Sequence, residues 1–348
     1  MNQTLHFIIA EGIETLTGGY VYDAEIVSGL RTMGWTVDVH EVGGGFPNPQ
    51  PEELGRLRAT LATLPADSLC VIDGLVFGAA PVEIKDAATR RSLIALVHHP
   101  LANETGLSES DQTRHWRNEL TALANANAVI VTSESTRRAL TERSMTTPCH
   151  VVLPGTELGA LGTLPKVPSH LLTVATVTPR KAQSVLLDAL DRIRDRSWFW
   201  SCAGSLSRDP LYAASLRAAI REKKLEDRVS LTGEIARDEL TKLFVDAHLF
   251  VFPSLYEGFG IAPMEAISHG IPVISTTGGA LSEALPPAAT HFVPPNSHEA
   301  LADAIAAVMD SPDRYERLSR GARQTRQTLR TWRDAADDFE AILRAPLG

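Results

Sequence analysis

Short apolar runs alternate with longer segments of mixed polarity along the chain, and the alternation occurs in both halves of the sequence. The apolar runs have the length of buried strands, whereas the longer segments carry apolar residues at helical spacing. Regular alternation of strand and helix favours a parallel sheet covered by helices. The sequence therefore predicts an α/β fold built from two doubly wound units.

The predicted elements are spread evenly over the two halves. The predicted strands are residues 5–9, 36–40, 69–72, 93–97, 128–131 and 150–152, followed by 171–175, 198–203, 229–232, 249–252, 273–275 and 291–293. The predicted helices include residues 22–33, 51–64, 110–125 and 134–143, followed by 184–194, 212–223, 237–246, 264–269 and 298–309.

The division into domains follows from the segment between the halves. Residues 154–168 are rich in glycine, proline and leucine and show no periodicity, which indicates a connecting segment. We expect an amino-terminal domain over residues 1–160 and a carboxyl-terminal domain over residues 161–329. A last helix within residues 330–348 carries Trp332, Ala335, Ala336, Phe339 and Leu343 on one face.

Composition narrows the class of protein. The chain has 348 residues, of which 44% are hydrophobic and 22% charged, as in globular proteins of two domains. A net charge of -9 disfavours a nucleic-acid partner, which needs a basic face. Because the sequence has no apolar run of about 18 residues and no signal peptide, we expect a cytoplasmic protein without an integral membrane segment. Cys70, Cys149 and Cys202 lie in or beside apolar stretches, which predicts buried thiols.

Two glutamates flank a glycine-rich turn directly after the predicted strand 249–252. Glu257 lies in the turn, Gly260 allows a close backbone approach to an anion, and Pro263 suits the first turn of a helix. The start of a helix binds phosphate, and Glu257 and Glu265 can accept hydrogen bonds from sugar hydroxyls. The simpler alternative is a strand, turn and helix with two solvated glutamates.

The whole string of residues 253–266, Pro-Ser-Leu-Tyr-Glu-Gly-Phe-Gly-Ile-Ala-Pro-Met-Glu-Ala, distinguishes these alternatives. It resembles the Glu-x7-Glu signature of retaining, nucleotide-sugar-dependent glycosyltransferases of family 4. The resemblance implies the GT-B fold, with two Rossmann-like domains facing across a cleft and a carboxyl-terminal helix that crosses back to the amino-terminal domain. It also implies a hexosyltransferase that moves a hexose from a nucleoside-diphosphate sugar to a hydroxyl acceptor, without a metal or cofactor.

The resemblance assigns catalytic positions to His98 and Glu257. Glu257 is expected to position the sugar rather than to form a covalent bond. His98 follows the predicted strand 93–97, where relatives place a histidine near the reacting sugar. Because adjacent residues in an extended segment point to opposite sides, only one of His98 and His99 is expected to face the ligand. The alternative is that both histidines are structural.

The donor diphosphate needs positive charge because the leaving nucleotide becomes more negative in the transition state. Lys181 matches the lysine of the family, whereas the usual upstream arginine is absent and Ala182 replaces a glycine. We expect Arg180 to supply the second positive charge. The other residues that the resemblance places on the diphosphate are Gly19, Phe259, Gly260 and Ile261, and those on the base and ribose are Gly204, Glu234, Ile235 and Glu265.

Two other classes of function share this architecture. A GT-B epimerase or hydrolase would act on the nucleotide sugar without an acceptor. A catalytically silent member would bind a nucleotide sugar but lack an effective phosphate site, and the absent arginine favours that alternative. Lys181, His98 and Glu257 disfavour it. UDP-glucose and GDP-mannose remain equally suitable donors, and the acceptor hydroxyl compound is open.

Overall fold

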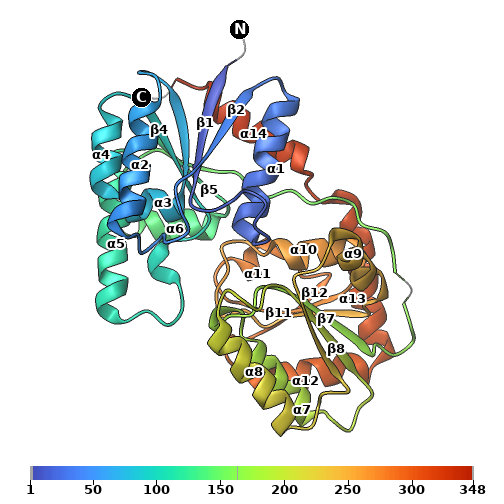
Figure 1. The fold of residues 1–348 in the computed structure, drawn as a ribbon. Helices are drawn as coiled ribbons and strands as arrows, with labels where there is room; N and C mark the ends of the chain where they lie inside the picture. The colour runs from blue at the N-terminus through green and yellow to red at the C-terminus, as the bar shows by residue number, and fades with distance from the viewer. Residues whose placement is uncertain (1–2, 163, 347–348) are drawn as a thin grey trace. The chain divides into compact units, whose positions relative to one another are not determined.

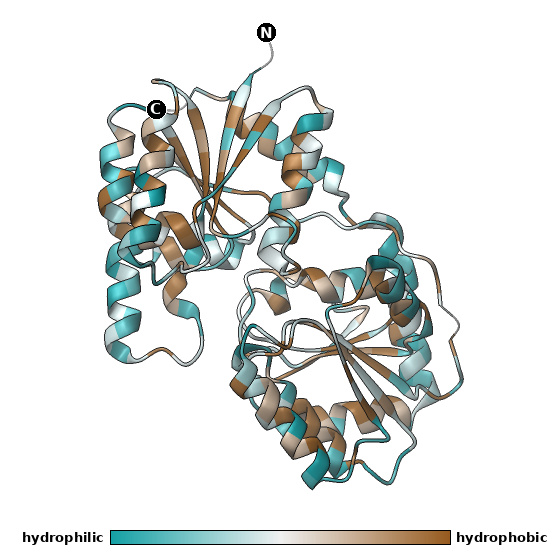
Figure 2. Ribbon diagram, in the orientation of Figure 1, coloured by the Kyte–Doolittle hydropathy of each residue, from teal (hydrophilic) through white to brown (hydrophobic). Residues whose placement is uncertain are grey.

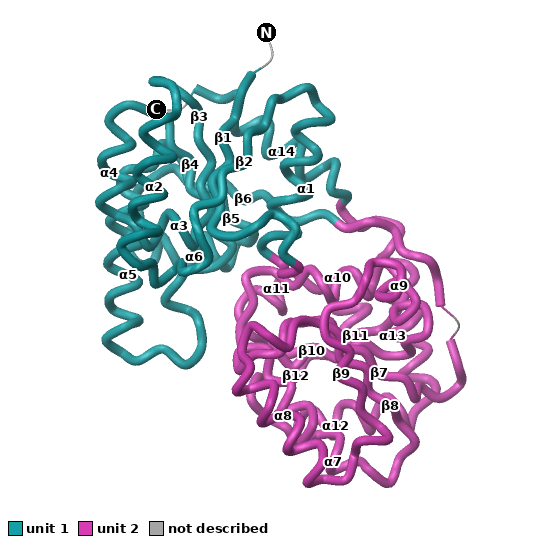
Figure 3. The backbone as a smooth tube through the Cα atoms, in the orientation of Figure 1, with its two compact units in different colours: residues 1–15, 19–155, 331–348 teal, residues 16–18, 156–330 magenta. Residues whose placement is uncertain are grey.

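The computed structural model describes residues 3–162 and 164–346, which divide into two compact units (Figures 1 and 3). One unit comprises residues 1–15, 19–155 and 331–348, and the other comprises residues 16–18 and 156–330. We call them the amino-terminal and carboxyl-terminal domains. Thr163 of the predicted connecting segment and the last two residues of the predicted 330–348 tail lie outside the described residues.

The amino-terminal domain is built on a parallel sheet. Its order is β2-β1-β3-β4-β5-β6, and every neighbouring pair is parallel. The strands are β1 (Thr4–Ile9), β2 (Thr36–Glu41), β3 (Leu69–Asp73), β4 (Ser92–Val97), β5 (Ala128–Val131) and β6 (Cys149–Val151). Each predicted strand of the first half is therefore confirmed to within about two residues.

The helices of this domain include two that the sequence analysis did not predict, α3 and α4. Asp73 starts α3 by accepting a hydrogen bond from the Leu75 amide at 3.0 Å, and Pro81 occupies the first turn of α4, where its missing N–H costs nothing. The helices are α1 (Gly18–Thr32), α2 (Pro51–Thr63), α3 (Gly74–Ala79), α4 (Pro81–Ala88), α5 (Glu109–Leu123), α6 (Glu134–Thr141) and α14 (Trp332–Arg344), with a short 3-10 helix η1 (Leu101–Asn103).

Helix α14 packs on the amino-terminal domain although it is the last element of the chain. The Trp332 ring lies edge-on to Tyr22 of α1 with centroids 6.0 Å apart, and Trp35 donates a hydrogen bond to Glu340 at 2.9 Å. A Cβ atom added to Gly29 of α1 would lie only 2.5 Å from the Ala336 Cβ. A glycine on α1 thus allows the two helices to approach closely.

The carboxyl-terminal domain repeats the parallel α/β plan. Its sheet order is β12-β11-β10-β7-β8-β9, again with parallel neighbours throughout. The strands are β7 (His170–Val174), β8 (Phe199–Ala203), β9 (Val229–Gly233), β10 (Leu249–Phe252), β11 (Val273–Thr276) and β12 (Thr290–Val293). These positions confirm the predicted strands of the second half.

The helices of this domain cover both faces of its sheet. They are η2 (Pro179–Lys181), α7 (Gln183–Arg192), α8 (Pro210–Glu222), α9 (Arg237–Asp246), α10 (Ile261–Ser268), α11 (Leu281–Ala284), α12 (His298–Met309), α13 (Pro312–Thr325) and η3 (Arg326–Thr328). Helix α10 begins three residues before the predicted residue 264, and α13 was not predicted. Its apolar stripe is narrow, because Tyr315, Leu318 and Ala322 are buried among many arginines.

Hydrophobic residues are concentrated on the strands of both sheets, and many helices carry hydrophobic and hydrophilic residues in alternation (Figure 2). One core of the carboxyl-terminal domain joins its sheet to α7, α8 and α12, and a second joins the sheet to α9, α10 and α13. Cys70 and Cys202 are buried free thiols, and Cys149 is a half-buried one. Among the residues described, no helix combines the length and the apolar character needed to cross a bilayer.

Strand order fixes where each sheet offers a ligand site. In the amino-terminal sheet the order reverses between β1 and β3, and in the carboxyl-terminal sheet it reverses between β7 and β10. The loops that follow two such strands turn to opposite faces and leave a crevice at the carboxyl ends of the strands. Candidate ligand-binding residues are therefore those after β1 and β3 in one domain, and after β7 and β10 in the other.

Candidate active site

In the carboxyl-terminal domain, the loops after β7 and β10 are hydrogen-bonded to each other. The Arg180 carbonyl accepts from the Leu255 amide at 2.8 Å and from the Ser254 hydroxyl at 3.2 Å. The Arg180 guanidinium in turn donates to the Tyr256 carbonyl at 2.8 Å. Backbone and side chain of one arginine thus connect the two loops at the switch point of the sheet.

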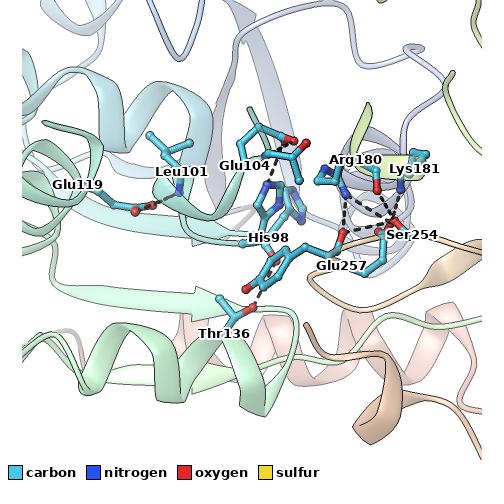
Figure 4. Close-up of polar contacts among 12 residues, drawn as sticks. His98, Leu101, Glu104, Glu119, Thr136, Arg180, Lys181, Ser254 and Glu257 are labelled. Atoms are coloured by element: carbon cyan, nitrogen blue, oxygen red, sulfur yellow. Dashed lines mark hydrogen bonds and ion pairs between the residues drawn. The ribbon is translucent and has the colours of Figure 1, made fainter. Parts of the chain in front are cut away.

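Glu257 is the centre of this cluster (Figure 4). Its Oε1 accepts from Lys181 Nζ at 2.6 Å, from Arg180 Nη1 at 3.3 Å, and from the Ser254 hydroxyl. Only 8% of Glu257 is exposed. Burial alone would raise the pKa of this carboxyl, but Lys181 and Arg180 outweigh it and hold the pKa below its usual value. Glu257 is therefore a carboxylate at neutral pH.

The loop after β11 fixes Glu257 from the other side. The Ala280 amide donates to the Glu257 carbonyl at 2.9 Å, and Thr276 donates to the Ser254 carbonyl. Gly279 has a φ of +65°, and a Cβ there would lie 2.3 Å from the Glu257 carbonyl oxygen. Only glycine allows this approach. The backbone of Glu257 is thus fixed by the loop after β11, and its carboxylate by Lys181, Arg180 and Ser254.

The electrostatics of this cluster favour an anion. Two cations, Arg180 and Lys181, face the carboxylate of Glu257. Helix α10 begins directly after Gly260, whose φ of +112° permits the turn into the helix. The first amides of a helix lack intrahelical partners and carry the positive end of its dipole. Phe259, Gly260 and Ile261 lie at this helix start, and their contact with a diphosphate stays a prediction.

The residues predicted to contact the base and the ribose lie after β8, after β9 and in helix α10. Gly204 follows β8 with a φ of +144°, and a Cβ there would lie 2.1 Å from the Ala175 carbonyl oxygen, so packing alone explains the glycine. Glu234 is exposed and Ile235 half-buried after β9. Glu265 forms an ion pair with Arg237 of α9 at 3.0 Å. Burial raises the pKa of Glu265, and Arg237 opposes that effect.

In the amino-terminal domain, His98 follows β4 and contacts two buried carboxylates. Its Nε2 lies 3.1 Å from Oδ1 of Asp23 on α1 and 3.5 Å from Oδ2 of Asp73 at the end of β3. Asp23 is 1% and Asp73 2% exposed. The sequence analysis missed both aspartates. The available signal was weak: Asp73 is an acid at the end of an apolar strand, and Asp23 interrupts the apolar face of a helix.

The surroundings of His98 fix its position and its charge. Burial lowers the pKa of His98, but the carboxylates of Asp23 and Asp73 outweigh burial and raise the pKa to about 10. A Cβ on Gly19 would lie 3.1 Å from the ring, so the glycine predicted for the diphosphate allows α1 to pack on His98. His99 instead lies beside Glu104, with Nε2 and Oε2 3.7 Å apart. The two histidines therefore have different environments.

Close carboxylates and imidazoles can also bind metal ions. Among the residues described, Asp23, Asp73 and His98 form one group in which a single potential ligand atom from each residue lies within 4.8 Å of the other two. The hydrogen bond between Asp23 and His98 accounts for the closest of these approaches. The expectation that the protein needs no metal stays a prediction.

Comparison with known proteins decides the family. Residues 162–325, which lie within the carboxyl-terminal domain, match the family described as glycosyl transferases group 1. The carboxyl-terminal domain is that of a group 1 glycosyltransferase. The sequence of this glycosyltransferase is 26% identical over 317 residues to MMP alpha-(1->4)-mannosyltransferase of Mycolicibacterium hassiacum, covering 86% of this chain and 75% of that protein. Two other curated relatives are matched over only 27% and 30% of their own length.

Solved structures agree on the fold of the glycosyltransferase. Sucrose-phosphate synthase of Thermosynechococcus elongatus superposes with a TM-score of 0.82 at 22% identity, covering 99% of this chain and 98% of that one. HepE of Anabaena, solved in complex with UDP-glucose, superposes with a TM-score of 0.78 at 17% identity, covering 98% and 99%. The two-domain GT-B fold expected from the sequence is thereby confirmed.

Proposed function

We propose that this glycosyltransferase is a retaining hexosyltransferase that moves a hexose from a nucleoside-diphosphate sugar to a hydroxyl acceptor. The observation that carries the proposal is the meeting of Arg180, Lys181 and Glu257 at the switch point of the carboxyl-terminal sheet. An arginine and a lysine beside a helix start suit a diphosphate, and a carboxylate between them suits sugar hydroxyls. A nucleoside-diphosphate sugar carries both a diphosphate and sugar hydroxyls, so it suits both the cations and the carboxylate of this cluster.

The contacts of Glu257 support a role in holding the sugar. All three donors from the protein, Lys181, Arg180 and Ser254, converge on Oε1. Within residues 3–162 and 164–346, Oε2 makes no hydrogen bond, so it is the oxygen that remains for a ligand hydroxyl. Because Oε1 is occupied by cations, the carboxylate is a weak nucleophile, which favours positioning over covalent catalysis.

Lys181 and the first amides of α10 are the groups we assign to the diphosphate. Negative charge grows on the leaving nucleotide as the glycosidic bond breaks, and fixed donors that meet this charge lower the barrier. In this proposal a donor phosphate oxygen accepts the proton of the acceptor hydroxyl, and neither a metal nor a cofactor takes part. The base and ribose stay assigned to Gly204, Glu234, Ile235 and Glu265.

The class of donor is supported by the relatives. HepE was solved with UDP-glucose, and the Mycolicibacterium relative is named a mannosyltransferase. Both names fit a hexose delivered by a nucleotide, and we extend that donor class to this chain.

A two-step experiment tests the function. First, thermal unfolding is measured with UDP-glucose, GDP-mannose and related donors, because a ligand that binds only the folded state raises Tm. Second, the stabilising donor is incubated with hydroxyl acceptors, and NMR determines the anomeric configuration of the product. Stabilisation by one nucleotide sugar and a product that keeps the donor configuration are expected.

Other outcomes identify the alternatives. Release of nucleoside diphosphate without any acceptor indicates a hydrolase, and stabilisation without turnover indicates a silent binder. An inverted product excludes the retaining mechanism. Absence of stabilisation by every nucleotide sugar excludes the donor class.

A further inference from the structure

Two buried carboxylates share one imidazole in the amino-terminal domain, whereas the donor cluster described above belongs to the carboxyl-terminal domain. Asp23 comes from α1, Asp73 from the end of β3, and His98 from the loop after β4. One oxygen of each carboxylate lies within 3.5 Å of His98 Nε2. The three residues therefore meet where the strand order of this sheet reverses.

The ring and the backbone of His98 are held by contacts with several elements. Gly19 and the Tyr22 ring lie against His98, the latter edge-on with centroids 5.4 Å apart. The hydroxyls of Thr132 and Thr136 both donate to the His98 carbonyl, at 3.0 and 3.4 Å. Backbone and ring are held from several elements, so the direction of each ring nitrogen is set by the fold rather than by solvent.

The two ring nitrogens have different roles in this setting. Nε2 faces both carboxylates, and within the described ranges Nδ1 makes no hydrogen bond. The side chain keeps 18% of its surface exposed, so the ring is not sealed from a ligand. Nδ1 is therefore the nitrogen that a bound molecule meets.

Charge balance favours the protonated ring. Asp73 already accepts from the Leu75 amide, and Asp23 Oδ2 is a buried oxygen without a hydrogen-bond donor among the described residues. Two carboxylates this deeply buried need a cation beside them. Two tyrosines of α1 lie near this group: burial raises the pKa of Tyr20, whose hydroxyl accepts from the Glu11 amide, and the Tyr22 hydroxyl donates to the Val152 carbonyl. Among the residues described, His98 is the cation that contacts both carboxylates.

We propose that Asp23 and Asp73 are positioning residues that hold His98 as an imidazolium, with Nε2–H directed at the carboxylates and Nδ1–H left as a hydrogen-bond donor to the ligand. His98 then acts on the transfer reaction as a fixed positive donor and not as a base for the acceptor hydroxyl. This inference rests on the proposed function for the reaction it serves. The protonation state itself does not depend on that function.

Asp23→Asn is the central variant because it keeps the shape of the side chain and removes its charge. Glu119→Gln is a matched control: Glu119 is also buried, at 1% exposure, in the same domain, and its carboxylate accepts from the Leu101 amide rather than from a histidine (Figure 4). Both variants replace one buried carboxyl group by an amide of the same shape, and burial raises the pKa of Glu119 to about 8, so this carboxyl is mostly neutral at pH 7. Only the first removes a charge that contacts His98.

The first measurement is NMR of the protein labelled with 15N on histidine, with His98 assigned from the spectrum of His98→Gln. At neutral pH the wild type and Glu119→Gln are expected to show both nitrogens of His98 protonated. Asp23→Asn is expected to shift the titration of His98 toward the ordinary histidine range. A neutral His98 in the wild type at pH 7 overturns the inference, whatever the activity of the protein.

The second measurement is kcat/KM for transfer as a function of pH. In Asp23→Asn, His98 should lose its proton at a lower pH than in the wild type. Above that pH, kcat/KM of the variant should fall on the order of tenfold to a hundredfold, with the KM for the donor little changed. An equal, pH-independent decrease in Asp23→Asn and Glu119→Gln indicates a merely structural role and overturns the inference. Stabilisation of the wild type but not of Asp23→Asn by Mn²⁺ or Zn²⁺ indicates a metal site instead and also overturns it.

Discussion

At the residue scale, Glu257 shows how a short motif becomes a site. The glutamate is buried, ionised and held through one oxygen by Lys181, Arg180 and Ser254. The sequence motif around Glu257 predicted that a carboxylate and an anion-binding site would lie next to each other. It did not predict that the cations of another loop would bind the carboxylate itself.

Lys181→Ala should lower kcat/KM for transfer far more than it lowers affinity for a nucleoside monophosphate, because the lysine acts on the diphosphate. We expect a loss of about 2 to 4 kcal/mol of transition-state stabilisation. Steady-state kinetics and calorimetric binding measure the two quantities. Lys242→Ala on the exposed side of α9 is the control. A near-normal kcat/KM in Lys181→Ala contradicts the assignment.

Arg180→Ala tests whether this arginine replaces the absent upstream arginine. We expect weaker binding of UDP or GDP and a smaller salt dependence of that binding. The double variant with Lys181→Ala should differ from the sum of the single changes, because both charges adjoin Glu257. If diphosphate affinity and its salt dependence are unchanged, Arg180 serves only to hold the Tyr256 and Glu257 loop.

The raised pKa of His98 makes a prediction about stability. Its value of about 10 in the folded protein exceeds the ordinary 6.5, so the imidazolium stabilises the fold fully below the ordinary value. This contribution is lost as pH rises from 6.5 toward about 10. His98→Gln should therefore lower the free energy of unfolding more near pH 6 than near pH 10, measured by urea denaturation. An equal cost at both pH values argues against the raised pKa.

At the element scale, helix starts and glycines decide how closely elements approach. Helix α14 lies on α1 because Gly29 and Ala336 are both small. The sequence predicted α14 from its apolar face, whereas α3, α4 and α13 escaped prediction. Helices α3 and α4 are short and read as one apolar stretch interrupted by glycine and proline. Such stretches cannot be divided by periodicity alone.

Gly29→Ala should destabilise the amino-terminal domain by about 1 to 3 kcal/mol, because its methyl group overlaps Ala336. Gly55→Ala is the matched control: Gly55 lies in α2, and a Cβ there meets nothing within 4 Å. That change should stabilise the protein by about 0.5 to 1 kcal/mol, because alanine suits a helix interior better than glycine. Urea denaturation measures both. Equal effects of the two changes contradict close packing of α1 and α14.

At the scale of the whole molecule, each domain places its candidate residues at the reversal of its own strand order. His98, Asp23 and Asp73 meet in one sheet, and Arg180, Lys181 and Glu257 meet in the other. The proposed chemistry uses only charges that the chain itself supplies.

Transfer should therefore persist in excess EDTA, because Arg180, Lys181 and the α10 amides supply the positive charge that a divalent ion would otherwise bring. Initial rates with and without chelator, and after addition of Mg²⁺ or Mn²⁺, measure this. The control is thermal unfolding in EDTA, which separates loss of a catalytic ion from loss of the fold. Abolition of turnover by EDTA and its restoration by a divalent ion contradict the metal-free mechanism.

The sequence by itself determined the strands of both sheets, the parallel α/β architecture and the position of the Glu257 motif. These features depend on local periodicity and on residues near one another in the chain, which a linear sequence displays. The tertiary structure alone brought Asp23 and Asp73 to His98, and paired Glu265 with Arg237. Such partners are far apart in sequence, and parallel strands bring their carboxyl ends together only once the order of the sheet is fixed.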